Sequence, residues 1–160
     1  MADAVIAPVP SVNLQRVFLK GQSFEMPGGA QLFIEQGQLQ MELNLAINSQ
    51  LLTDDVYEVS LRGTLTARLG DKVQFLAELD QAGIFEIKNL SADDTVLFIE
   101  TVAPGVIAPY LRSALSEVLS RATLPGFYLP EVNWQAMHNE RVAASAAAEA
   151  ATGPIPALLH

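Results

Sequence analysis

The chain has no cysteine and only two histidines among its 160 residues. Without cysteine it cannot form a disulfide, bind a metal through thiolates or use a thiol as a nucleophile. Basic residues are also scarce, since 9 lysines and arginines stand against 18 acids and give a formal net charge of −9. Binding to a phosphate backbone needs clustered Lys and Arg, so this balance argues against a nucleic-acid partner and favours basic ones.

Long apolar runs are missing as well. No segment approaches the roughly 18 apolar residues of a membrane span. The first twelve residues, MADAVIAPVPSV, lack the basic start and the apolar stretch of a signal peptide. We therefore expect a cytoplasmic protein that does not insert into a membrane. The length fits one domain, and half of the residues are apolar, which is enough to build a core without metal or disulfide staples.

The clearest pattern in the sequence is the alternation of apolar and polar residues. In LQMELNLAI, residues 39–47, every odd position is apolar, which predicts a half-buried strand. The same period of two recurs in residues 57–69 and, after the turn residues Gly70-Asp71, in residues 73–81. In this last strand Leu76 is an exception, because it shares the polar face with glutamine, glutamate and aspartate side chains.

Residues 13–26 alternate less regularly, and a bulge near Lys20-Gly21 would reconcile their apolar positions. With this segment the first half of the chain holds four strands, joined largely by short turns. That arrangement predicts an antiparallel sheet with one buried and one solvated face.

The second half has the period of helices. Ser91 followed by Asp94 resembles a capping box, and the helix it starts should stop at Ala103-Pro104-Gly105. Residues 106–122 then predict an amphipathic helix. Its apolar stripe consists of Ile107, Tyr110, Leu111, Ala114, Leu115, Val118, Leu119 and Ala122. Asn133 is a candidate N-cap for a last helix that begins at Trp134. We expect an α+β fold with helices packed on one face of the sheet.

The sequence offers no catalytic constellation. It has no GxSxG elbow, no glycine-rich phosphate loop with lysine and no HExxH. The aspartates Asp54-Asp55, Asp71 and Asp93-Asp94 could suggest a cation site, but they fall where turns and helix starts favour aspartate. We expect no catalytic residue, no metal and no cofactor, and hence a binding or assembly protein rather than an enzyme.

Several stretches, taken in order, resemble the SecB family of bacterial protein-export chaperones. They are LQRVFLKGQSFEMP at 14–27, DDVYEVSLRGTLTARLGDKVQFLAELDQAGIFEI at 54–87, APGVIAPYLRSALSEVLSRATLP at 103–125 and LPEVNWQAM at 129–137. The resemblance implies a four-stranded antiparallel sheet with packed helices and a homotetramer built as a dimer of dimers. It also implies an ATP-independent chaperone that holds unfolded secretory precursors and delivers them to SecA, the translocation motor.

The resemblance assigns two sets of residues. The apolar face of the second strand, with Met41, Leu43 and Leu45, would bind clients, helped by Tyr110 and Trp134. The alternation that marks these strand residues is equally typical of core residues, so both readings stay open.

SecA would dock on an acidic surface of the sheet that contains Glu25, Leu76 and Glu78. Gly21 departs from the family, whose well-known members carry an acid there, and Asp80 or Glu86 could supply charge in its place. The alanine-rich C-terminus also departs from the polar, acidic tail of many relatives.

The boundaries expected from these patterns are a flexible segment 1–12, a SecB-like chaperone domain 13–142 and an alanine-rich C-terminal segment 143–160 that is partly mobile. Two other readings remain open. A SecB-like chaperone can be dedicated to an antitoxin instead of export, and an unrelated α+β protein could bind a small molecule between sheet and helix.

Overall fold

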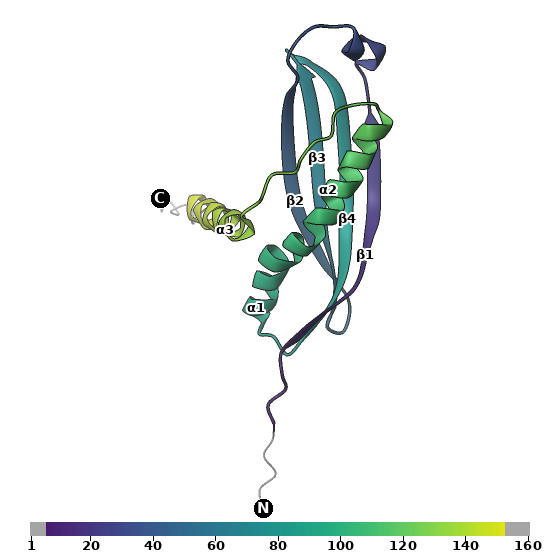
Figure 1. Ribbon diagram of the computed structural model, residues 1–160. Coiled ribbons are helices and arrows are strands. Elements are labelled where there is room, and N and C mark those ends of the chain that lie inside the picture. The colour runs from purple at the N-terminus through teal and green to yellow at the C-terminus, as the bar shows by residue number, and fades with distance from the viewer. Residues whose placement is uncertain (1–5, 153–160) are drawn as a thin grey trace, which may run out of the picture.

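The computed structural model describes residues 6–152, which form a four-stranded antiparallel sheet with helices on one side (Figure 1). The strands are β1 (Ser11–Glu25), β2 (Gln40–Thr53), β3 (Val56–Leu69) and β4 (Lys72–Lys88), with a short 3-10 helix, η1 (Gly29–Phe33), between β1 and β2. Their order across the sheet is β1-β4-β3-β2. The expected α+β class is confirmed, and β1 and β2 are the two edges.

The strands are longer than the alternation predicted. β2 and β4 continue beyond residues 47 and 81, where small and polar residues break the pattern but the pairing with β3 persists. β1 already begins at Ser11. The expected bulge is present, since the pairing of β1 with β4 shifts between Leu19 and Gly21.

The aspartate pairs lie in turns and at a helix start. Asp55 has a φ of 59° in the turn between β2 and β3, and Gly70, before Asp71, has the same φ in the turn between β3 and β4. In helix α1 (Ala92–Leu97) the hydroxyl of Ser91 accepts the backbone N–H of Asp94 at 3.1 Å. The turn and capping interpretation of these residues is therefore confirmed.

The helix does not stop at Ala103-Pro104-Gly105, and this prediction was wrong. α1 continues through a π-helical segment, η2 (Phe98–Val102), directly into α2 (Ala103–Arg121). In η2 the N–H of Ala103 bonds the carbonyl of Phe98, five residues back. The wider turn comes immediately before Pro104, which has no N–H to donate, so the chain enters α2 without a break.

The core lies between α2 and the two central strands, β3 and β4. Leu61 and Leu65 of β3 and Phe75 of β4 are fully buried there. The helix comes close to the sheet at Gly63, where a Cβ atom would lie only 3.1 Å from the Leu111 side chain. Glycine at this position lets the backbones of strand and helix approach each other.

Tyr110 is not part of the buried stripe of α2, which corrects the sequence reading. Its side chain is 50% exposed, whereas Pro104 and Ala108 are buried with Ile107 and Leu111. With 3.6 residues per turn, burial of these two residues shifts the packing face away from Tyr110.

The continuous helix Ala92–Arg121 is long and apolar enough to cross a membrane by length and composition alone. Its C-terminal half packs within the fold, because Ile107, Leu111, Leu115 and Leu119 are buried against the sheet. We therefore interpret it as a core helix.

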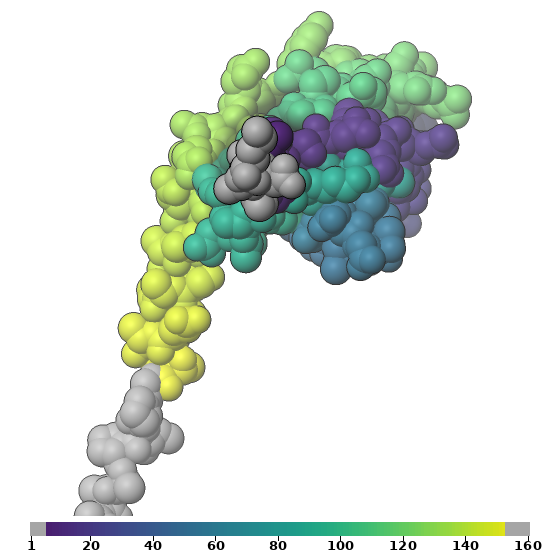
Figure 2. Space-filling model, turned by 90° about the horizontal axis from the view of Figure 1, so that it is seen from below, coloured from purple at the N-terminus to yellow at the C-terminus, as the bar shows by residue number. Residues whose placement is uncertain are grey.

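The last helix, α3 (Trp134–Ala151), stands away from the body (Figure 2). Its expected N-cap is confirmed, because the Asn133 side chain accepts the N–H of Ala136 at 2.9 Å. Its main contact with the body is η2, where Glu100 pairs with His138 and Arg141. Residues 1–5 and the tail GPIPALLH, 153–160, lie outside the described residues, so the expected mobility of both ends stays a prediction.

The position of Tyr110 can be checked by two truncations. Leu111→Ala should lower the free energy of unfolding by about 2–5 kcal/mol, because it empties a buried site under α2. Tyr110→Ala should cost roughly 1 kcal/mol or less, because it removes a half-exposed ring. Urea unfolding at matched protein concentration measures both. Equal losses would place Tyr110 in the packing stripe after all.

Candidate functional site

One face of the sheet carries no helix, and the three predicted docking residues meet on it. Glu25 of β1 lies directly opposite Leu76 of β4 in the antiparallel register. Glu78, two residues further on β4, points to the same face and lies opposite Thr64 of β3. Leu76 is half-buried, with Glu25 beside it. We call Glu25, Leu76 and Glu78 the docking surface.

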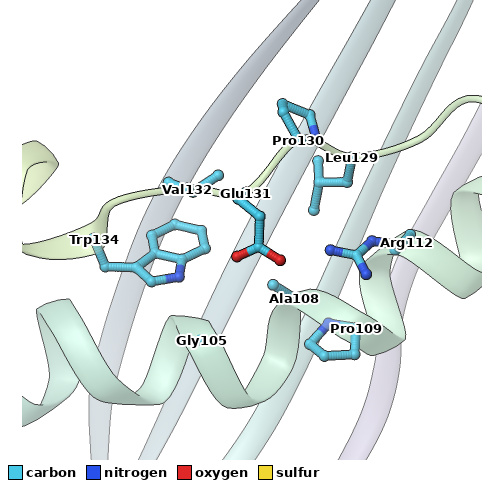
Figure 3. A pocket seen from close by; sticks show the side chains of 9 residues that line it. All are labelled: Gly105, Ala108, Pro109, Arg112, Leu129, Pro130, Glu131, Val132 and Trp134. Carbon is cyan, nitrogen blue, oxygen red and sulfur yellow. The ribbon is translucent and has the colours of Figure 1, made fainter.

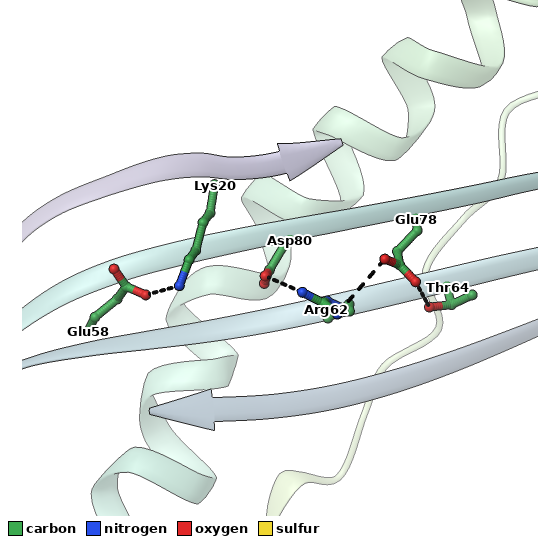
Figure 4. A network of polar contacts seen from close by, with 6 residues as sticks. All are labelled: Lys20, Glu58, Arg62, Thr64, Glu78 and Asp80. Atoms are coloured by element: carbon green, nitrogen blue, oxygen red, sulfur yellow. Dashed lines mark hydrogen bonds and ion pairs between the residues drawn. The ribbon is translucent and has the colours of Figure 1, made fainter. Parts of the chain in front are cut away.

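Glu78 of the docking surface belongs to a polar network that also contains bases (Figure 4). Arg62 of β3 lies between two carboxylates: its Nη2 donates to Asp80 Oδ2 at 3.0 Å, and its Nη1 lies 3.9 Å from Glu78 Oε1. The Thr64 hydroxyl is 3.4 Å from Glu78 Oε2. At the end of the network Lys20 pairs with Glu58.

The two carboxylates that flank Arg62 differ in exposure. The Glu78 side chain is 45% exposed, whereas that of Asp80 is 10% exposed. The hydrogen bond and the charge of Asp80, and then the charge of Glu78, raise the pKa of Arg62 above its ordinary value. The hydrogen bond from Lys20 to Glu58 raises the pKa of that lysine in the same direction. Arg62 and Lys20 therefore keep their positive charges at neutral pH, and of the two carboxylates beside Arg62, Glu78 is the one exposed to solvent.

Neither of the acids considered as a substitute for the missing charge at position 21 is free. Asp80 lies opposite Gly21, but it is buried and paired with Arg62. Glu86 lies near the far end of β4, opposite Asn13, and its carboxylate is 2.7 Å from Lys88 Nζ.

The predicted client residues of β2 lie on the other, helix-covered side of the sheet. Met41, Leu43 and Leu45 are opposite Ala67, Leu65 and Gly63 of β3, which are buried. α2 packs on β3 and β4, so the edge strand is at the margin of its cover. Met41 remains 39% exposed, and the two leucines are half-buried against the core. These residues thus form both the border of the core and an apolar surface.

Trp134 lines a cavity of about 290 Å³ between α2 and the loop that leads to α3 (Figure 3). The other lining residues are Gly105, Ala108, Pro109, Arg112, Leu129, Pro130, Glu131 and Val132. The indole lies next to Gly105, where a Cβ atom would be 3.5 Å from Nε1. Tyr110 does not line this cavity, so the structure does not bring the two predicted aromatics together.

Sequence reasoning missed Arg62 and, apart from Trp134, the residues of this loop cavity. The alternation in residues 57–69 puts Arg62 on the solvated face of its strand, but only the register places it between Glu78 and Asp80. Arg112 and Glu131 are 19 positions apart in the sequence and meet only because the loop turns back along α2. Among residues 6–152, no group of three or more His, Cys, Asp or Glu side chains has the arrangement of a metal site.

Three comparisons place the chain among known proteins. The family model described as "SecB: Preprotein translocase subunit SecB" matches residues 7–145. The protein-export protein SecB of Methylibium petroleiphilum is 42% identical over 137 residues, which cover 86% of this chain and 84% of that protein. The protein-export protein SecB of Paraburkholderia phymatum is 38% identical over 144 residues, which cover 90% of this chain and 92% of that protein.

A solved structure shares the fold. The SecB-like chaperone of Mycobacterium tuberculosis, in complex with a ChAD peptide from the HigA1 antitoxin, matches with a TM-score of 0.62 and 13% identity, over 76% of this chain and 90% of that one. The family model and the two relatives confirm the sequence resemblance to SecB over most of the chain. This protein belongs to the SecB family of protein-export chaperones.

Proposed function

We propose that this protein is an ATP-independent chaperone of the cytoplasm that holds precursor proteins unfolded for export and delivers them to SecA. The match of nearly the whole chain to relatives named protein-export protein SecB carries this proposal. The two separate surfaces of the sheet support it, because a chaperone that hands over its client must contact client and motor at the same time. The net charge of −9 disfavours a nucleic-acid partner.

Clients bind on the helix-covered side of the sheet in this proposal. Met41, Leu43 and Leu45 offer an apolar row on an edge strand, which we call the client surface, and Trp134 and Tyr110 add aromatic surface on that side. Unfolded chains share exposed apolar side chains, so a surface of this kind holds many sequences without selecting one. Methionine adapts its shape to different clients.

The opposite face binds SecA in this proposal. Leu76 supplies an apolar centre, and Glu25 and Glu78 supply charge around it. A small apolar centre with a polar rim is typical of protein interfaces. No ion pair involves Glu25 in the described part of the chain, whereas Glu78 shares Arg62 with Asp80. The charge of Glu25 is therefore available to a basic partner.

We propose a homotetramer, a dimer of dimers, as the working form. Its support is a set of apolar side chains on the helix run α1–η2–α2 that are 40–50% exposed in the single chain. They are Val96, Leu97, Val102 and Tyr110. Exposed apolar residues of this kind mark contacts between subunits. Several modest client surfaces on one tetramer let a long unfolded chain bind by avidity and still be released.

The client surface is tested by replacing Leu43 and Leu45 with glutamate. We expect the double variant to lose the ability to hold an unfolded precursor, because two buried charges would replace apolar contacts with the client. Delay of precursor refolding measures holding, and native mass measures the tetramer. The matched control is Asn44→Glu with Asn48→Glu, which adds the same charges to the opposite face of β2. Unfolding or dissociation of the leucine variant would show that the two residues are core, and would contradict the assignment.

The docking surface is tested by Glu25→Lys and Glu78→Lys. Each reversal should weaken SecA binding by roughly tenfold, about 1.4 kcal/mol, and should reduce its dependence on salt. Titration calorimetry at two salt concentrations measures both effects. Glu35→Lys makes the same charge change on an exposed residue next to η1 and should leave binding intact. If both reversals bind SecA like the wild type, the docking claim is lost.

A further inference from the structure

Two basic side chains of α3 contact one carboxylate of the body. His138 Nδ1 lies within hydrogen-bond distance of Glu100 Oε2. Arg141 Nη2 is 2.7 Å from the same oxygen, in an ion pair without hydrogen-bond alignment. Within residues 6–152, both ion pairs that join α3 to the rest of the chain end on Glu100. We call Glu100, His138 and Arg141 the Glu100 cluster.

The Glu100 cluster is partly shielded from water. The side chains of His138 and Glu100 are 15% and 27% exposed, whereas Glu117, in an ion pair with Arg121 on α2, is 69% exposed. Salt and water screen a shielded pair less than one on the open surface. Glu100 also belongs to η2, on which α3 makes its main contact with the body. The cluster is therefore placed to hold α3 in one position.

Trp134 lies on the same face of α3 as the two bases. Trp134, His138 and Arg141 stand at positions i, i+4 and i+7 of the helix, and residues at these spacings share a face. One turn before His138, the indole lies against α2, where a Cβ atom on Gly105 would be 3.5 Å from Nε1 (Figure 3). A contact that fixes His138 and Arg141 therefore also fixes where the indole points.

The position of the indole matters because Trp134 forms one wall of the cavity of about 290 Å³. Its side chain is half-buried, and it packs against the border of the core. A side chain that is already held in place loses little conformational freedom when a ligand contacts it, whereas a loose one must be ordered first. Contacts that hold Trp134 should therefore strengthen the binding of whatever enters this cavity.

We propose that Glu100 is a positioning residue for client binding: by holding His138 and Arg141 it fixes α3 against η2 and keeps Trp134 at the cavity wall. This inference rests on the client role proposed for Trp134 and adds the contact that keeps the indole in place. Glu100 acts through α3 and does not itself touch the client.

The first measurement is the fluorescence of Trp134 in the full-length protein. The chain has no other tryptophan, so quenching of its emission by acrylamide reports the exposure of this indole alone. We expect Glu100→Gln and Arg141→Gln each to raise the quenching constant roughly twofold, because the indole then leaves the cavity wall for part of the time. Raising the salt concentration from about 0.05 to 1 M should increase quenching in the wild type more than in Glu100→Gln.

The matched control is Glu117→Gln. It makes the same chemical change on the same run of helix and removes the pair in which Arg121 Nη2 is 3.5 Å from Glu117 Oε1. Because this pair does not involve α3, we expect wild-type quenching of Trp134 and wild-type holding of clients.

The second measurement is the delay that the protein imposes on the refolding of a urea-unfolded secretory precursor. Glu100→Gln should hold the precursor roughly threefold more weakly than the wild type, because the indole must be ordered on binding. In a Trp134→Ala background the same substitution should cause no further loss, because the cluster acts through the indole. A general structural role of Glu100 would instead lower holding in both backgrounds.

Wild-type quenching in both Glu100→Gln and Arg141→Gln would overturn the inference, and so would an equal loss of holding in the two backgrounds. A wild type that never delays refolding would overturn the proposed function, while the quenching constants would still decide whether the Glu100 cluster positions Trp134. Circular dichroism and native mass verify the fold of each variant, and Arg141→Gln breaks the cluster from the other side if Glu100→Gln does not fold.

Discussion

The packing of α2 across β3 and β4 determines the rest of the structure. Glycine at position 63 lets the helix approach the sheet closely, and Leu111 fills the space above it. This contact buries one face of the two central strands and leaves their other face without a helix. Because α2 packs on β3 and β4, the edge strand β2 lies at the border of the area that the helix covers. Both candidate surfaces follow from this single arrangement, one on each side of the sheet.

The separation of the two surfaces has a physical consequence for function. A residue on β4 that points toward α2 belongs to the core, and its neighbour in sequence points to the bare face. In our proposal, a client on the helix side and a motor on the bare face would therefore not compete for the same side chains. The same strands carry both candidate surfaces, one on each face of the sheet.

On the bare face, more of the acidic side chains are paired with bases than the acidic composition of the chain suggests. Arg62 stands between Glu78 and Asp80, and Lys20 holds Glu58, so much of the negative charge is neutralised within the face. The charge that remains is local, with Glu25 beside Leu76 and the exposed Glu78 two residues further along β4. A face with a few defined charges selects a partner by geometry as well as by sign.

The sequence predicted the strands well because a half-buried strand needs alternating residues, and it predicted both helix caps because Ser91 and Asn133 are the residue types that satisfy free N–H groups. It failed where the outcome depends on several residues together. Taken by themselves, Pro104 and Gly105 predict the end of a helix. The π-helical turn before them accommodates the N–H that Pro104 lacks, so the helix continues.

Tyr110 fits an apolar stripe until the burial of Ala108 shows how the helix is rotated. The position of Arg62 beside Asp80 depends on strand register, and no local pattern contains that information. The sequence therefore indicated which residues share a face, but not which of them touch.

The central claim is that this protein holds an unfolded chain. Native mass spectrometry with and without an unfolded secretory precursor tests it most directly. The account predicts a complex of four copies with one precursor chain, formed with the unfolded precursor and absent with the folded one. A mass that never includes the precursor, or an assembly that binds only a small molecule, would contradict it.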